Sequence, residues 1–167
     1  MRRRRPEKRT ILPDPLFNDM LAAKFINNIM SDGKKSLAEK IFYTSIEKIE
    51  ETTKTKDGLE VFKKAINNVC PMLEVKSKRI GGATYQVPME VSGDRSEALA
   101  LRWIVSFAKS RKGSAMSNAL AKEIMEAYQG EGSTIRRRDE VHRRGEERGG
   151  PQRQGQDGDA EGVGRAA

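Results

Sequence analysis

Apolar residues recur with helical spacing along most of this chain. Between Phe17 and Ile29 they repeat every four residues, which indicates one apolar face of a helix. We expect this helix to begin at Asp14-Pro15, because aspartate caps helices well and proline costs no hydrogen bond at the first helical position. Gly33 is expected to end it.

Five further helices are expected between residues 36 and 144. Three of them begin at capping boxes, in which a polar residue caps the helix and a glutamate follows three residues later. The fourth helix is the most apolar, with Trp103 expected in the core, so we place it at the centre of the fold. The boxes start at Ser36, Asp57 and Asp94, Ser114 caps the fifth helix, and the sixth helix runs from Ser133 to about Arg144.

The segment Leu73–Val91 has the alternating pattern of β-strands instead. Gly81-Gly82 lies between two apolar runs, which indicates a hairpin. A two-residue turn at these glycines would place Val75 opposite Pro88, whereas a three-residue loop would place Val75 opposite Val87. A slip of one residue turns every side chain to the other face, so the two registers predict different buried faces.

We expect the three-residue loop, Ile80-Gly81-Gly82, because it pairs apolar residues on a face that the helices can bury. Gly82 would then supply the positive φ of a bulge. Val87 and Met89 are expected to pack against the helices. Tyr85 is the one aromatic residue that could stack on a base, but a packing role is favoured for it.

The predicted fold class is therefore mainly α, with a six-helix bundle-like body and a two-stranded β-hairpin that projects between the third and fourth helices. The chain has 167 residues, which favours a single domain. We assign residues 1–144 to that domain, with a basic N-terminal arm at residues 1–11 and the hairpin at residues 73–91. Residues 145–167 form a Gly/Gln/Asp-rich tail that is expected to be disordered.

The charge of the chain indicates its class of partner. The net charge is +8 and only 36% of the residues are hydrophobic, which predicts a modest core and a heavily charged surface. Residues 1–144 alone carry +10, because the tail carries −2. A nucleic acid is therefore a more plausible partner than a membrane, and no apolar run approaches the length of a membrane span. The single cysteine, Cys70, is compatible with a reducing compartment.

Catalytic chemistry is hard to build from these residues. His142 is the only histidine, and no cluster of cysteine and histidine supports a metal site. Gly33-Lys34-Lys35 resembles part of a phosphate loop, but it lacks the glycine spacing and the preceding strand. We therefore expect no enzyme activity, no metal, no cofactor and no small-molecule substrate.

Cations instead gather at several loops and helix ends. This distribution suits a protein that binds a folded polyanion through its phosphates and its shape, with little base stacking. The residues expected to contact RNA are Arg2, Arg3, Arg4, Arg5, Lys8, Arg9, Lys34, Lys35, Lys76, Arg95, Arg102, Lys109, Arg111, Lys112, Arg136, Arg137, Arg138 and Arg143. Lys78, Arg79, Gly81 and Gly82 are assigned to the RNA-binding tip of the hairpin.

Three blocks of the sequence resemble one known family, the bacterial-type seventh protein of the small ribosomal subunit. They are LPDPLFNDMLAAKFINNIMSDGKKSLAEKIFYTS, VKSKRIGGATYQVPMEV and ALALRW, which span Leu12–Ser45, Val75–Val91 and Ala98–Trp103. The similarity extends over about Arg3–His142. After His142 the sequence departs from the helix that usually ends the family's chains.

The resemblance implies a cytoplasmic, non-catalytic constituent of the small ribosomal subunit. Such a protein would bind the 3′ major domain of small-subunit ribosomal RNA (rRNA) and nucleate assembly of the subunit head. It would lie near the exit-site transfer RNA (tRNA) and the messenger RNA (mRNA) path, beside small-subunit protein eleven.

A second reading is an architectural DNA-binding protein, since a helical body with a basic β-arm can also grip duplex DNA. Ile80 would be the one candidate for an apolar wedge in the minor groove.

Overall fold

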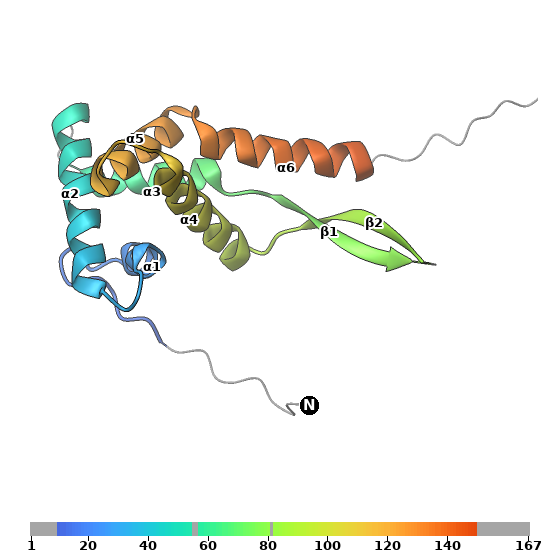
Figure 1. Ribbon diagram of the computed structural model, residues 1–167, viewed down its shortest axis with the longest axis horizontal. Helices are drawn as coiled ribbons and strands as arrows, with labels where there is room; N and C mark the ends of the chain where they lie inside the picture. Colours follow the sequence, from blue (N-terminus) through green and yellow to red (C-terminus); the bar gives the residue numbers. More distant parts are fainter. Residues whose placement is uncertain (1–9, 55–56, 81, 150–167) are drawn as a thin grey trace, which may run out of the picture.

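The computed structural model describes residues 10–54, 57–80 and 82–149. It confirms the predicted fold class: six helices, with a two-stranded antiparallel hairpin between the third and the fourth (Figure 1). In chain order the elements are α1 (Met20–Ile29), α2 (Lys35–Thr53), α3 (Gly58–Val69), β1 (Leu73–Ile80), β2 (Ala83–Glu90), α4 (Gly93–Ser110), α5 (Met116–Gln129) and α6 (Ser133–Gly149).

The helices enclose one hydrophobic core. Phe25, Phe42 and Phe62, from the first three helices, are fully buried and meet with ring centroids 4.9–5.7 Å apart. The most extensive helix packing is that of α5, which contacts α2, α3, α4 and α6. The expectation that α4 is the central helix was therefore wrong, and Trp103 on α4 is only partly buried at the edge of the core.

The first helix begins later than its sequence pattern predicts. Asp19, not Asp14, caps α1, and its carboxylate accepts the backbone N–H groups of Leu21 at 2.7 Å and Ala22 at 3.4 Å. The Asp14 carboxylate instead accepts N–H groups within a separate turn at residues 15–17. Asp14 and Asp19 lie only five residues apart, and the apolar pattern continues across both. The pattern therefore does not indicate which aspartate begins the helix. The helix also ends at Ile29, ahead of Gly33.

The three predicted capping boxes make no side-chain cap hydrogen bond in this structure. Helices α2 and α4 begin one residue before their boxes, at Lys35 and Gly93. In the third box, the Glu97 carboxylate pairs instead with Lys24 of α1 at 2.7 Å. This tertiary ion pair occupies the carboxylate that would otherwise complete the capping box.

The hairpin has the register of the two-residue turn, so the preferred three-residue loop was wrong. Val75 pairs with Pro88 and Ile80 with Ala83, which leaves two glycines between the strands. Gly82 has the expected positive φ, at +89°, while Gly81 lies outside the described residues.

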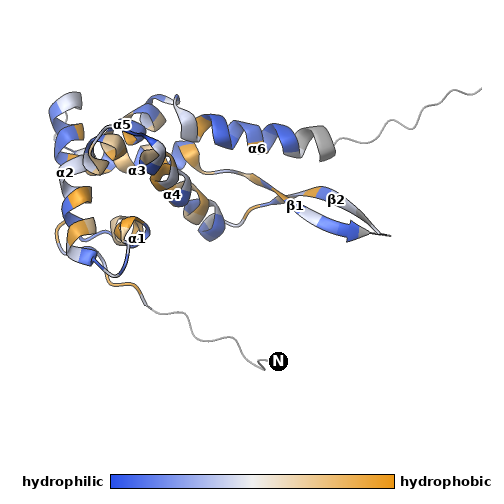
Figure 2. Ribbon diagram, in the orientation of Figure 1, coloured by the Kyte–Doolittle hydropathy of each residue, from blue (hydrophilic) through white to orange (hydrophobic). Residues whose placement is uncertain are grey.

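This register exposes residues that were expected to be buried. Tyr85 is 54% exposed and Met89 is 47% exposed, and Val87 is only half-buried. They share this face of the ribbon with their cross-strand neighbours, which are Lys78, Glu74 and Lys76 respectively. In Figure 2 the hairpin is hydrophobic near its base and hydrophilic toward its tip.

Helix α6 lies alongside the hairpin and supports it (Figure 1). It was expected to end near Arg144, but it continues to Gly149. Gly145 is buried there because it packs against Leu73 and Pro88 at the base of the hairpin. The first five residues of the tail that was expected to be disordered, 145–149, are therefore helical, and residues 150–167 lie outside the described part.

Gly145 gives a first prediction. A Cβ built at this position would lie 3.4 Å from Leu73 Cδ1 and 3.6 Å from Pro88 Cβ, which are ordinary contact distances. Glycine costs a helix interior about 0.5–1 kcal/mol relative to alanine. Gly145→Ala should therefore raise the free energy of unfolding by about 1 kcal/mol in urea denaturation. A loss of stability would mean that Leu73 or Pro88 lies closer to Gly145 than these distances and clashes with the added methyl group.

Candidate nucleic-acid interface

Three cations follow one side of α4. Arg95, Arg102 and Lys109 are spaced by seven residues, so they drift by only about 20° per step around the helix. All three are exposed, and the stripe spans fourteen residues, or about 21 Å of helix. That is a length suited to several successive phosphates of a nucleic acid.

The N-terminal end of this stripe joins the hairpin. The Arg95 guanidinium donates to Glu74 on β1, with Nη2 and Oε1 2.9 Å apart. This hydrogen bond lowers the pKa of Glu74 below its ordinary value, against the opposing effect of its partial burial. Arg95 thus holds the hairpin base while part of its side chain remains exposed.

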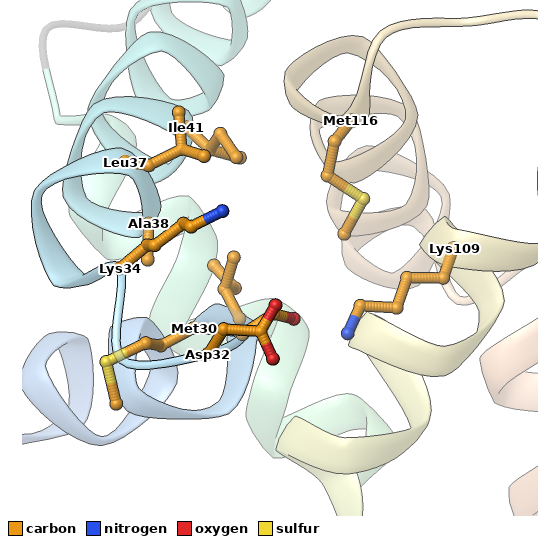
Figure 3. A pocket seen from close by; sticks show the side chains of 10 residues that line it. Met30, Asp32, Lys34, Leu37, Ala38, Ile41, Lys109 and Met116 are labelled. Carbon is orange, nitrogen blue, oxygen red and sulfur yellow. The ribbon is translucent and has the colours of Figure 1, made fainter.

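The C-terminal end of the stripe faces a hollow between the helices. The hollow, of about 250 Å³, has an apolar lining that includes Leu37, Ile41 and Met116. In Figure 3 the side chains of Lys34 and Lys109 point into this space from opposite sides, with Asp32 between them. The two amino groups bring positive charge to this interhelical slot, and the Asp32 carboxylate between them offsets part of it.

The cations of the hairpin are well placed for an external partner. Lys76, Lys78 and Arg79 are exposed, and they make no ion pair within the part of the chain that the structure describes. Tyr85 lies directly opposite Lys78 in the ladder and is also exposed. The packing role predicted for Tyr85 was therefore wrong, because the two-residue turn moves it to the outward face. A tyrosine ring beside lysine amino groups can stack on a base.

Arg111, in contrast, serves the fold. Its guanidinium donates to the Glu123 carboxylate, from Nε at 3.0 Å and from Nη2 at 2.6 Å, and also to Glu126. Hydrogen bonding to Glu126 raises the pKa of Arg111. The Glu123 carboxylate is 0% exposed and accepts the backbone N–H and hydroxyl of Thr134 as well. The sequence-based assignment of Arg111 to the RNA interface is not supported, because its donors are engaged internally.

The basic residues of α6 are also partly engaged. Arg137 pairs with Glu140 at 2.9 Å, and Arg138 pairs with Asp139 at 2.7 Å and donates to the Asn68 carbonyl. Arg136 and Arg143 are exposed. The helix therefore offers fewer cations to a partner than its sequence predicts.

Two further lysines from the predicted set lie at interhelical turns. Lys112 is exposed, and Lys35 is exposed with a weak contact of 3.6 Å to Glu39. Gly82 at the tip is exposed as well. The cations of the N-terminal arm fall outside the described residues: Arg2, Arg3, Arg4, Arg5, Lys8 and Arg9.

His142 has a structural partner that sequence reasoning did not find. Its Nε2 accepts the backbone N–H of Met72 at 2.9 Å, which ties α6 to the start of β1. The two residues are seventy positions apart, so no local pattern could reveal the contact. Over residues 10–54, 57–80 and 82–149, no group of three or more potential metal ligands is present. No helix in these ranges is both long and apolar enough to cross a membrane.

Comparison with known proteins identifies the family of the chain. The model of the ribosomal protein S7p/S5e family matches residues 1–148. The chain belongs to this family. Two relatives, each described as "Small ribosomal subunit protein uS7", come from Kosmotoga olearia and Thermotoga maritima. They are 53% and 54% identical over 146 residues, which cover 87% of this chain and 94% of each relative.

A third relative with the same description, from Salinibacter ruber, is 50% identical over 141 residues. Membership makes the chain a structural, non-enzymatic constituent of the small ribosomal subunit, so its place is the ribosome in the cytoplasm. The family match also runs to residue 148, six residues beyond His142, where the sequence was expected to depart from the family.

Proposed function

We propose that the stripe along α4 and the exposed hairpin form one surface that binds the 3′ major domain of small-subunit rRNA and nucleates assembly of the subunit head. One observation carries this proposal. The stripe meets a second group of cations at each end, at the hairpin through Arg95 and at the interhelical slot through Lys109. A polyanion that follows α4 would therefore remain in contact with cations over its whole length.

The exposed members of the predicted set define this surface. Those described are Lys34, Lys35, Lys76, Lys78, Arg79, Arg95, Arg102, Lys109, Lys112, Arg136 and Arg143. We assign the arm residues from Arg2 to Arg9 to the same interface, since a block of like charges extends along phosphates. Arg137 and Arg138 have a secondary role, because part of their charge is neutralised by neighbouring carboxylates.

We assign the hairpin tip to further RNA. The tip projects away from the helical body in Figure 1, so it can reach beyond the RNA bound along α4. In an assembled subunit these partners would be the exit-site tRNA and the mRNA, with small-subunit protein eleven nearby. The alternative of an architectural DNA-binding protein has no separate observation in its favour.

The test replaces the two tip cations. Lys78→Ala combined with Arg79→Ala should weaken binding to a 3′ major domain transcript by about ten-fold, because two phosphate contacts are lost. The free energy of unfolding should change by less than about 0.5 kcal/mol, since both side chains are exposed. Binding would be measured by filter retention and stability by thermal melting.

A matched control removes the same charge elsewhere. Lys64 on α3 and Lys122 on α5 are exposed and lie outside the proposed surface. Their double alanine variant should bind the transcript nearly as wild type does. Equal losses for the tip and control variants would show that net charge, and not this surface, determines binding.

A further inference from the structure

The orientation of the hairpin depends on a few polar contacts at its base. The Pro71 carbonyl accepts the Ser96 hydroxyl of α4 at 2.8 Å. The next residue, Met72, donates its N–H to His142 of α6 at 2.9 Å. Glu74 then pairs with Arg95 of α4. The base is thus held between two different helices.

Apolar packing of the hairpin on α6 is found near the base, where Leu73 and Pro88 lie against Gly145. A hollow of about 270 Å³ lies between the hairpin, α4 and α6, and its lining includes Val75, Ser77 and Gln86 of the strands and Trp103 of α4. From Lys76 to Arg79 every residue of β1 is exposed. The direction of the tip is therefore controlled at the base.

A small rotation at the base produces a large displacement at the tip, because the strands are long. Lys78 is six residues from Met72, or about 20 Å along an extended strand. A rotation of about 10° at the base would displace the Lys78 backbone by about 3 Å, given that strand length. Such a displacement equals a whole hydrogen-bond length, so it would break a contact between Lys78 and a phosphate.

We propose that His142 is a positioning residue for RNA binding by the hairpin. Its Nε2 accepts the Met72 N–H and thereby holds α6 against the start of β1, which aims Lys78 and Arg79 at the RNA. This inference rests on the proposed function of the hairpin and deepens it. His142 itself touches no RNA in this account and acts through the orientation of the two strands.

Two amide substitutions test whether a hydrogen-bond acceptor at the position of His142 Nε2 is sufficient without the imidazole ring. His142→Gln can place its side-chain oxygen near the position of Nε2, whereas His142→Asn reaches only to that of Nδ1. Both keep a polar side chain on α6. The Asn variant should lose the hydrogen bond to Met72 and the Gln variant should keep it.

The first readout uses the full ¹⁵N-labelled chain without RNA. In His142→Asn the Met72 amide should exchange with solvent faster, and residual dipolar couplings of β1 and β2 should change relative to those of α1–α5. In His142→Gln both should match wild type. Unchanged couplings in His142→Asn would overturn the proposal, even if its RNA affinity fell.

The second readout is a double-mutant cycle with the 3′ major domain transcript as probe. His142→Asn should weaken binding by about three-fold or more, which exceeds the non-additivity that independent sites show. In the background of Lys78→Ala and Arg79→Ala it should cause no further loss. Additive losses, or wild-type affinity in His142→Asn, would overturn the positioning role.

The double-mutant cycle also distinguishes the positioning role of His142 from the RNA-binding function proposed for the hairpin. If the tip variant binds as wild type, the function proposed for the hairpin fails. If the tip variant binds weakly but His142→Asn binds normally with altered couplings, only the role of His142 fails.

Discussion

Replacing Arg111 by alanine is expected to destabilise the fold by about 2–4 kcal/mol, because removal of one partner strands a buried charge. The Glu123 carboxylate is 0% exposed and would lose the donors that neutralise it. The Arg111 side chain is 29% exposed, so the expected loss lies toward the lower part of the range for fully buried pairs. Urea denaturation of the free protein measures it.

The effect of Arg111→Ala on RNA binding should arise through unfolding alone. At a temperature where the variant is folded, its affinity for the 3′ major domain transcript should be close to that of wild type. Lys112→Ala serves as the control for stability, because Lys112 is the next residue and is exposed. That substitution should change stability by less than about 0.5 kcal/mol.

Unchanged stability together with weaker RNA binding would instead support the sequence-based prediction that Arg111 contacts RNA. If Arg111→Ala melts as wild type does but binds RNA poorly, Arg111 is an RNA contact after all. Arg111→Lys gives a finer test, because a lysine lacks the planar fork that reaches both Glu123 and Glu126. Arg111→Lys should keep only part of the stability that Arg111→Ala loses.

Arg111 also shows why charge counting overestimates an interface. In the sequence, the Ser110–Gly113 turn is a basic cluster like any other. Its partner Glu123 is twelve residues away on another helix, and only the packing of α5 brings the two together. Lys109 and Lys112, from the same predicted set, are exposed and make no ion pair within the described residues.

The helices themselves followed from local pattern, but their ends did not. Apolar spacing is a property of each segment, so the existence of all six helices could be predicted. A cap depends on competition with the rest of the fold. Glu97 does not complete the predicted box at Asp94, because its carboxylate pairs with Lys24, seventy-three residues away.

The predicted hairpin register was wrong for a related reason, because it too depends on contacts with the rest of the fold. Pairing Val75 with Val87 collects apolar residues on one face, which is favourable only if that face is the buried one. The structure instead buries the face with Leu73 and Pro88 against Gly145 of α6. Pro88 supplies the apolar partner of Val75 in this register, and α6 continues five residues beyond its predicted end at Arg144.

The steepest effect we expect in solution is that of salt on RNA binding. Eight cations of the predicted set are exposed and form no ion pair in the described part of the chain: Lys34, Lys76, Lys78, Arg79, Arg102, Lys109, Lys112 and Arg136. If most of them contact phosphates, about six to ten counterions are released on binding, once the arm is included.

Affinity for the 3′ major domain transcript should then fall by about 10³–10⁵ between roughly 50 mM and 200 mM salt. The plot of log K against log salt should be linear, and the Lys78→Ala, Arg79→Ala variant should reduce its slope by about 1.5–2, the share of two phosphate contacts. The Lys64→Ala, Lys122→Ala variant should leave the slope unchanged, because those lysines lie outside the surface. A nearly flat wild-type slope would contradict phosphate-dominated binding and would direct attention to stacking at Tyr85 instead.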